Sequence, residues 1–246
     1  YISLMAPHYP WDLPRDFYYA IRPDSVALPD MSPGQLGPIN GWNSSLANND
    51  WGSLSLDQHR LCLARYKGAV AWMDHLIGQV LDRLDALKLT RKTLVVYTSD
   101  HGDMAGSKGL WLKSVMYDPA ARKPLLVRMP GHIPKGWTTD GLLGEVDLLP
   151  TLAGLVDVDL NADVRGEDYS EALRRPAHPE LGAPVVFSAI PGPTWAEHPF
   201  MLMARGPRYK LTRFQGAVEN NQPKAYELFD MDEDPLETLN LLGDSA

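Results

Sequence analysis

The sequence has little cysteine, an excess of acidic over basic side chains, and no long apolar run. Its only cysteine among 246 residues, Cys62, excludes an internal disulfide and any cysteine-rich metal centre, and it leaves the redox compartment undecided. The 31 acidic and 23 basic side chains give a net charge of −8, so a nucleic-acid-binding surface, which needs clustered Lys and Arg, is not expected. No apolar run approaches the roughly 20 residues that a membrane span requires, so no membrane span is expected.

The composition that is present is that of a folded domain, with 44% hydrophobic and 22% charged residues. Residues 1–6 are apolar and predict a buried strand. Because this strand has no segment leading into it, we expect the sequence to be a piece of a longer chain. Seven prolines between residues 7 and 50 predict an irregular segment.

Regular structure is predicted from residue 55 onward. Ser55 and Gln58 fit a capping box, and apolar residues at helical spacing predict a helix from about Leu56 to about Leu87. Apolar, partly β-branched runs predict strands at 93–98 and 124–129, covered on both faces, followed by a helix over 147–155. Short strands at 185–188, 201–204 and 209–212 have no helix between them and predict antiparallel hairpins. The chain is therefore predicted to be α/β up to about residue 175 and antiparallel after it.

Polar side chains follow two of the predicted strands. His8 follows residues 1–6, and Asp100 and His101 follow residues 93–98. If the two strands are parallel, these side chains face one crevice, because ligand sites lie outside the carboxyl ends of parallel strands. An Asp–His pair followed by a glycine suits a metal site. The alternative is that Asp100 caps a turn and His101 lies at the surface.

Further sequence motifs follow along the chain. They are Gly-Leu-Trp-Leu-Lys at 109–113, Tyr-Asp at 117–118, Arg-Lys-Pro-Leu at 122–125, Asp-Leu-Leu-Pro-Thr-Leu at 147–152, Glu-Leu-Phe-Asp at 227–230 and Asp-Pro-Leu-Glu-Thr-Leu-Asn-Leu at 234–241. Together with Pro-His-Tyr-Pro at 7–10 and Ser-Asp-His-Gly-Asp at 99–103, they resemble the sulfatase family of the alkaline phosphatase superfamily. The Asp-His pair and the Trp-containing motif are most similar to the choline sulfatase and phosphonate monoester hydrolase branch. The resemblance covers nearly the whole chain.

The resemblance implies a fold and a division into domains. Residues 1–175 would be the C-terminal part of an α/β catalytic domain, with an alkaline-phosphatase-like mixed, largely parallel sheet flanked by helices. Residues 176–246 would be a small antiparallel β subdomain with a C-terminal helix or tail. The family's C/S-x-P-S-R nucleophile motif does not occur in this sequence. We therefore expect the formylglycine nucleophile upstream of it, and no turnover by this chain alone.

The resemblance also implies roles for single residues. Asp100 and His101 would be ligands of a divalent metal, calcium first, with manganese as the alternative because imidazole suits manganese better. Lys113 would hold the sulfuryl group as a point charge, and His8 would contact that group or protonate the leaving oxygen. Cys62 would be a small packed side chain within the helix. Two further expectations are an exposed Lys108 and a surface position for the remaining histidines, His59, His75, His132, His178 and His198.

The function implied is the metal-dependent hydrolysis of a small-molecule sulfate ester. One alternative is a phosphonate or phosphate ester hydrolase with the same core, because phosphoryl and sulfuryl groups share tetrahedral geometry. A second alternative is a non-catalytic fragment that binds an anion or a partner. The sequence does not indicate the identity of the substrate.

Overall fold

The computed structural model describes residues 1–32, 53–160, 163–175, 182–190, 200–215 and 225–243, and it forms two compact units. The first unit comprises residues 1–90, 101–113 and 119–122, and the second comprises residues 91–100, 114–118 and 123–246. The chain therefore passes between the units several times, and each unit is described below by itself.

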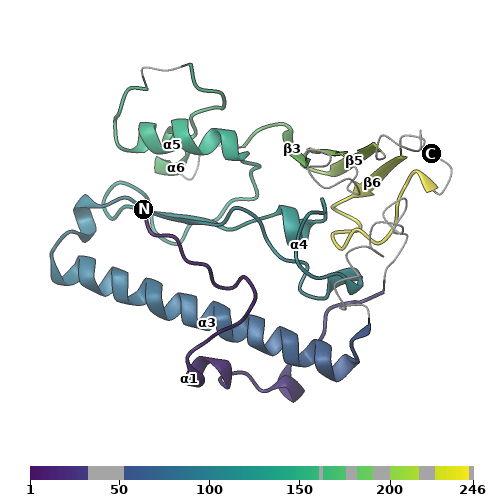
Figure 1. Cartoon of the computed structure of the whole chain (residues 1–246). Helices are drawn as coiled ribbons and strands as arrows, with labels where there is room; N and C mark the ends of the chain where they lie inside the picture. The colour runs from purple at the N-terminus through teal and green to yellow at the C-terminus, as the bar shows by residue number, and fades with distance from the viewer. Residues whose placement is uncertain (33–52, 161–162, 176–181, 191–199, 216–224, 244–246) are drawn as a thin grey trace. The chain divides into compact units, whose positions relative to one another are not determined.

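The first unit is organised around one long helix, α3 (Leu56–Ala86), drawn in blue in Figure 1. The Ser55 hydroxyl accepts a hydrogen bond from the Gln58 amide, and the Gln58 side chain accepts one from the Ser55 amide. This reciprocal capping box satisfies two amides that the helix leaves without partners, and it fixes the residue at which the helix begins. The helix predicted from about Leu56 to about Leu87 is confirmed.

A short helix, α1 (Arg15–Tyr18), packs against α3. The backbones approach closely at Gly68, where a Cβ atom would lie 2.5 Å from the carbonyl oxygen of Phe17. Arg65 of α3 is buried, donates to the Tyr18 carbonyl, and places its guanidinium 4.1 Å from the centre of the Tyr18 ring. The first unit also contains the 3₁₀ turns η1 (Pro23–Ser25) and η4 (Ser107–Gly109). The 3₁₀ turn η3 (Thr90–Lys92) begins at the last residue before the chain enters the second unit. Residues 33–52 of the predicted irregular segment lie outside the described residues.

The buried cluster of the first unit joins α3 to two distant segments. Leu63 and Ala64 of the helix pack with Val26 and with Trp111. Cys62 is half-buried and packs against this cluster, and burial raises the pKa of its thiol. The cluster therefore anchors Trp111, two residues before Lys113, on the long helix.

The second unit contains two antiparallel sheets. Strand β1 (Val95–Thr98) pairs with β2 (Leu125–Arg128), with Val96 opposite Val127. A four-stranded sheet has the order β3-β4-β5-β6. Its strands are β3 (Val186–Ile190), β4 (Phe200–Arg205), β5 (Tyr209–Gln215) and β6 (Ala225–Asp230). The helical elements of this unit are η5 (Glu145–Asp147), α5 (Leu148–Leu155) and α6 (Ser170–Arg174). Helix α4 (Asp118–Ala121) begins in this unit at Asp118, and its other residues belong to the first unit.

A buried ionic cluster ties the four-stranded sheet to other parts of the second unit. Nζ of Lys210, on β5, lies 2.7 Å from a carboxylate oxygen of Asp118 and 2.7 Å from one of Glu237. Lys210 and Glu237 are almost fully buried, and burial raises the pKa of Glu237 although Lys210 acts in the opposite direction. Tyr117 donates a hydrogen bond to buried Glu227 of β6, 3.1 Å away. Residues 117–118 and 227–241, which carry family motifs, thus meet in one network.

Several expectations from the sequence need correction. Residues 1–6 are not a strand in the structure, and β1 and β2 pair antiparallel rather than lying parallel. Both sheets among the described residues are antiparallel, so the largely parallel pairing expected from the resemblance is not found within this part of the chain. Leu126 of β2 is 60% exposed, so that strand is not covered on both faces. Strand β6 was not predicted, whereas the C-terminal antiparallel arrangement is confirmed.

The predicted division at residues 1–175 and 176–246 stays a prediction.

Among the residues that the structure describes, no helix is both long enough and apolar enough to cross a membrane.

Candidate active site

The side chains of His8 and Lys113 meet in the first unit. Nζ of Lys113 lies 2.8 Å from Nε2 of His8, although 105 positions separate the residues in the sequence. The two residues come from segments that both rest on α3, one leading into residues 9–13 and the other anchored by Trp111. The structure therefore brings together the two side chains for which a catalytic role was predicted.

The hydrogen bonds of His8 define which ring nitrogen faces Lys113. Nδ1 of His8 lies 2.5 Å from the carbonyl oxygen of Tyr9, which accepts only, so Nδ1 carries the proton. Nε2 then has the lone pair that accepts from the Lys113 ammonium group. The ring also stacks on Tyr9, with centroids 5.0 Å apart. His8 is exposed, so this nitrogen and the lysine can be reached by a solute.

His101 has the same kind of orientation. Its Nδ1 lies 2.7 Å from the carbonyl oxygen of Gly102 and donates to it. In the neutral ring, Nε2 is then the nitrogen that can bind a metal or accept a proton. The side chain is half-buried.

The loop that carries His101 and Lys113 is held by its own hydrogen bonds. Asp103 Oδ1 accepts from the amides of Ala105 and Leu112, at 2.8 and 3.1 Å. The Met104 amide donates to the Leu112 carbonyl at 2.7 Å. Burial raises the pKa of Asp103, and the two amide donors oppose that effect. Sequence reasoning gave Asp103 no role, yet it closes the loop that presents Lys113.

Gly102 is required by a close backbone approach. A Cβ atom at this position would lie 2.1 Å from the carbonyl oxygen of Pro119, and the Gly102 amide donates to the Ala120 carbonyl at 2.8 Å. Any side chain would push the loop away from residues 119–122. The glycine that follows the Asp–His pair therefore serves packing as well as the turn.

Asp100 belongs to the second unit, where it follows β1. Its carboxylate accepts from the Ser99 hydroxyl at 3.2 Å, and its carbonyl oxygen accepts from Lys123 at 3.2 Å. Lys123 also forms an ion pair with Glu145. The side chain of Asp100 is exposed.

Two expectations for neighbouring side chains were wrong. Lys108 is 7% exposed, because η4 turns it inward with a left-handed backbone (φ 57°) and its amide donates to the Asp30 carbonyl at 2.9 Å. His59 is 4% exposed, because Trp111 packs against it. The predicted surface positions of His75 and His132 are confirmed, and His178 and His198 lie outside the described residues.

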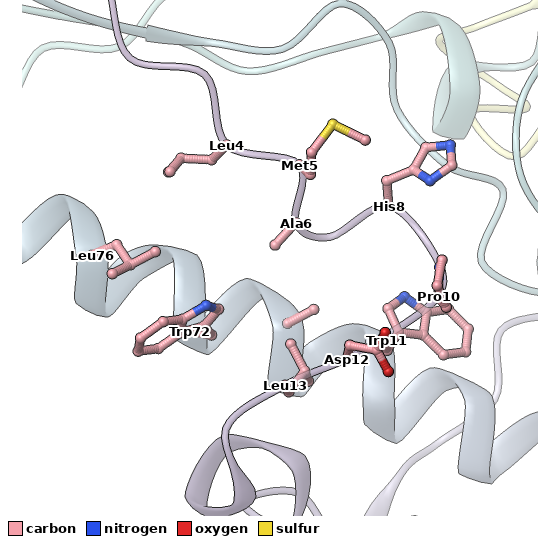
Figure 2. A pocket seen from close by; sticks show the side chains of 11 residues that line it. Leu4, Met5, Ala6, His8, Pro10, Trp11, Asp12, Leu13, Trp72 and Leu76 are labelled. Atoms are coloured by element: carbon pink, nitrogen blue, oxygen red, sulfur yellow. The ribbon is translucent and has the colours of Figure 1, made fainter.

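A cavity of about 260 Å³ lies beside His8, between residues 4–13 and α3. Figure 2 shows Trp72 and Leu76 on the helix and Leu4 and Ala6 on the segment that passes above it. Among the described residues that line it, only His8 and Asp12 are titratable, and neither is a fixed cation. These lining residues therefore provide no fixed positive charge for an anionic group. Lys113, which carries such a charge, is not one of them.

Comparisons with known protein families find two matches that together cover the chain. Residues 1–158 match the sulfatase family, and residues 106–246 match the family described as N-sulphoglucosamine sulphohydrolase, C-terminal. The chain belongs to the sulfatase family. The alkaline-phosphatase-like α/β class expected from the sequence is confirmed by its structural similarity to sulfatases.

Individual relatives of this sulfatase chain differ in what they act on. An ulvan-active sulfatase of Formosa agariphila is 29% identical over 98% of the chain and 43% of its own length. A choline-sulfatase of Rhizobium meliloti is 26% identical over 98% of the chain and 45% of its own length. A phosphonate monoester hydrolase of Silicibacter pomeroyi has a similar structure, with a TM-score of 0.80 and 25% identity over 97% of the chain and 50% of its own. The chain therefore spans about half the length of these proteins.

The donor atoms of the sulfatase chain are compatible with part of a metal site. Asp100 offers carboxylate oxygens, and His101 offers Nε2. Within the described residues, no group of three or more His, Cys, Asp or Glu side chains is arranged to hold a metal ion. Calcium takes about 6–8 oxygen ligands, so the carboxylate of Asp100 suits it, whereas the imidazole nitrogen of His101 suits manganese better. The two residues supply only a minor share of the ligands of a complete site.

Proposed function

We propose that the protein containing this chain hydrolyses sulfate esters, and that His8 and Lys113 act on the sulfuryl group. The observation that carries this proposal is the 2.8 Å separation of Lys113 Nζ and His8 Nε2. Membership of the sulfatase family and the sulfatases among its relatives support it.

The positively charged ammonium group of Lys113 would bind the sulfate ester. Its ammonium group carries three N–H donors, of which one points to His8 in the structure. The other two can donate to sulfuryl oxygens, whose negative charge increases as the S–O bond breaks. A donor fixed before the reaction stabilises such charge without reorganisation, which is why the closed loop around Asp103 matters to the chemistry.

His8 would act at Nε2, because Nδ1–H is engaged by the Tyr9 carbonyl. To act as a general acid, the ring must first take up a proton at Nε2 from solvent and give up the hydrogen bond that it accepts from Lys113. This proton could then be given to the leaving oxygen of the ester. The same atom could instead donate to a sulfuryl oxygen. The two roles differ in how strongly they depend on the leaving group.

Asp100 and His101 would contribute to holding a divalent metal, with calcium as the first candidate and manganese as the second. When bound, such a metal polarises the nucleophile and a sulfuryl oxygen. The nucleophile itself is proposed to be a formylglycine in the part of the protein that precedes this chain.

Hydrolysis of a phosphonate or phosphate ester is the second candidate, and the structural similarity to a phosphonate monoester hydrolase favours it. The deciding experiment is to compare kcat/KM of the full polypeptide on an aryl sulfate and on an aryl phosphonate with the same leaving group. Faster turnover of the sulfate is expected. A higher kcat/KM on the phosphonate would reject the sulfatase assignment in favour of the second candidate.

A further inference from the structure

His59 and Trp111 form a buried hydrogen bond that sequence reasoning did not foresee. The indole Nε1–H of Trp111 donates to Nδ1 of His59 at 3.0 Å, and the two rings are within 10° of parallel. The separation of 3.0 Å is that of an ordinary hydrogen bond from an N–H donor. Both side chains are buried, at 4% and 3% exposure.

The position of His59 is fixed by the start of α3. Its amide donates to the Ser55 carbonyl at 2.9 Å, in the turn closed by the capping box of Ser55 and Gln58. The imidazole is therefore attached to the first turn of α3, whose start the capping box defines. A side chain fixed in this way can hold a neighbouring irregular segment in position.

Trp111 belongs to such a segment. Its side chain packs with Leu63 and Ala64 of α3. The residue after it, Leu112, donates its amide to the Asp103 carboxylate and accepts from the Met104 amide. The next residue is Lys113. A shift of the indole ring would therefore be transmitted over two residues to the ammonium group that meets His8.

The protonation state of His59 suits this contact. Indole N–H is only a donor, so Nδ1 of His59 must be unprotonated to accept from it. Burial lowers the pKa of His59, which keeps the ring neutral. An imidazolium ring would present an N–H to the indole N–H and lose the bond.

We propose that His59 is a positioning residue for Lys113, acting through the Trp111 indole. This inference rests on the proposed function, since it concerns the lysine that would hold the sulfuryl group. It predicts that removing either partner misplaces the Lys113 ammonium group without removing it.

The test uses the full polypeptide that contains this chain and the variants His59→Leu, Trp111→Phe, His59→Asn and the double variant His59→Leu/Trp111→Phe. Readouts are kcat and KM on an aryl sulfate, the inhibition constant of inorganic sulfate, and the indole ¹⁵N–¹H resonance of Trp111. His75→Leu is the matched control, because His75 is an exposed histidine of the same helix.

Loss of either partner is expected to lower kcat/KM by about tenfold to a hundredfold, because misplacement by about 1 Å has effects of that size. The inhibition constant of sulfate should rise as well, which a smaller folded fraction alone would not cause. The double variant should be no worse than the worse single variant, because both single changes break one bond. His59→Asn should recover most of the loss, since its amide oxygen can accept in place of Nδ1.

Normal kcat/KM and sulfate inhibition in both single variants, while Lys113→Ala is impaired, would overturn the positioning role and leave the proposed function standing. A silent Lys113→Ala would instead remove the basis of both. If His59→Leu does not fold, Trp111→Phe and His59→Asn still decide the matter: a normal Trp111→Phe enzyme rejects the proposal.

Discussion

Lys113 and His8 share a hydrogen bond of 2.8 Å across 105 positions of sequence, and both side chains can be reached from solvent. Neither residue is held by the other alone. The lysine is presented by a loop closed through Asp103, and the histidine ring is oriented by the Tyr9 carbonyl. Each member is therefore positioned by its own segment of the chain, and the two can be tested separately.

Lys113→Ala in the full polypeptide is expected to lower kcat/KM on an aryl sulfate by about a hundredfold or more. Removing one preorganised donor to a developing charge typically costs about 3–4 kcal/mol of transition-state stabilisation. Lys67→Ala is the matched control, because Lys67 is an exposed lysine of α3 in the same unit. Lys108 is unsuitable as a control, since it is buried. Equal losses in the Lys67 and Lys113 variants would remove Lys113 from the site.

His8→Ala is expected to slow poor leaving groups more than good ones. If Nε2 donates a proton to the leaving oxygen, its loss matters less when that oxygen is already weakly basic. The measurement is kcat/KM over a series of aryl sulfates with leaving-group phenols of different acidity. His132→Ala, a change at an exposed histidine, should leave the series unchanged. A uniform loss across the series would mean that His8 binds sulfuryl oxygens and is not the proton donor.

Asp100→Ala is expected to abolish most metal binding in the full polypeptide, whereas His101→Asn should weaken it less and favour calcium over manganese. Asp100 contributes a negative charge, and Asn would replace an imidazole nitrogen with an oxygen ligand. Metal content of the purified variants, measured by elemental analysis, checks this. An unchanged metal stoichiometry in Asp100→Ala would contradict the assignment.

A polypeptide of residues 1–246 alone is expected not to hydrolyse aryl sulfates, because it contains no C/S-x-P-S-R sequence. The assay compares it with its own Lys113→Ala variant, so that a contaminating activity is recognised. Turnover above that variant would show that a nucleophile lies within these residues.

Lys210→Met is expected to destabilise the protein by about 3–5 kcal/mol near neutral pH, because it leaves the buried carboxylate of Glu237 and the half-buried carboxylate of Asp118 without their cation. Lys135→Met, at an exposed lysine, is the control. The free energy of unfolding in urea measures the effect.

The cost should shrink as the pH falls. The pKa of Glu237 is raised in the folded protein, so the folded state binds the proton more tightly than the unfolded chain. The stabilisation that comes from proton binding by Glu237 is therefore fully present below the pKa that Glu237 has in the unfolded chain. It is lost as the pH rises through the pKa that Glu237 has in the folded protein. Without Lys210 the pKa of Glu237 in the folded protein rises further, so more stability is lost as the pH is raised. A destabilisation independent of pH would contradict this account.

The sequence predicted those elements whose causes are local. The capping box of Ser55 and Gln58 and the apolar spacing after it predicted α3 almost to the residue. The burial of Lys210 was not predictable in this way, because its partners Asp118 and Glu237 come from distant positions. The same reason applies to His59, whose burial depends on Trp111, 52 residues away.

Within the candidate site, the order of motifs predicted His8, Asp100, His101 and Lys113. The structure adds that His8 and Lys113 are in contact and that His101 has its Nδ1 engaged. Residues 1–6 and 93–98 were expected to bring the groups together if they formed parallel strands, but residues 1–6 are not a strand, and β1 pairs antiparallel with β2. Strand direction was not readable from residue types, because an apolar, β-branched run of four to six residues fits either pairing.

The contact between Gly102 and the Pro119 carbonyl limits how this loop can vary in evolution. A methyl group at position 102 would overlap that oxygen, so even alanine is excluded, and the neighbour is backbone that cannot rotate away. Gly136 offers a contrast, since its backbone is left-handed (φ 74°) but nothing lies within 4 Å of a Cβ atom there. Asparagine, which tolerates that conformation, can replace Gly136, whereas position 102 admits only its present residue as long as residues 119–122 keep their path.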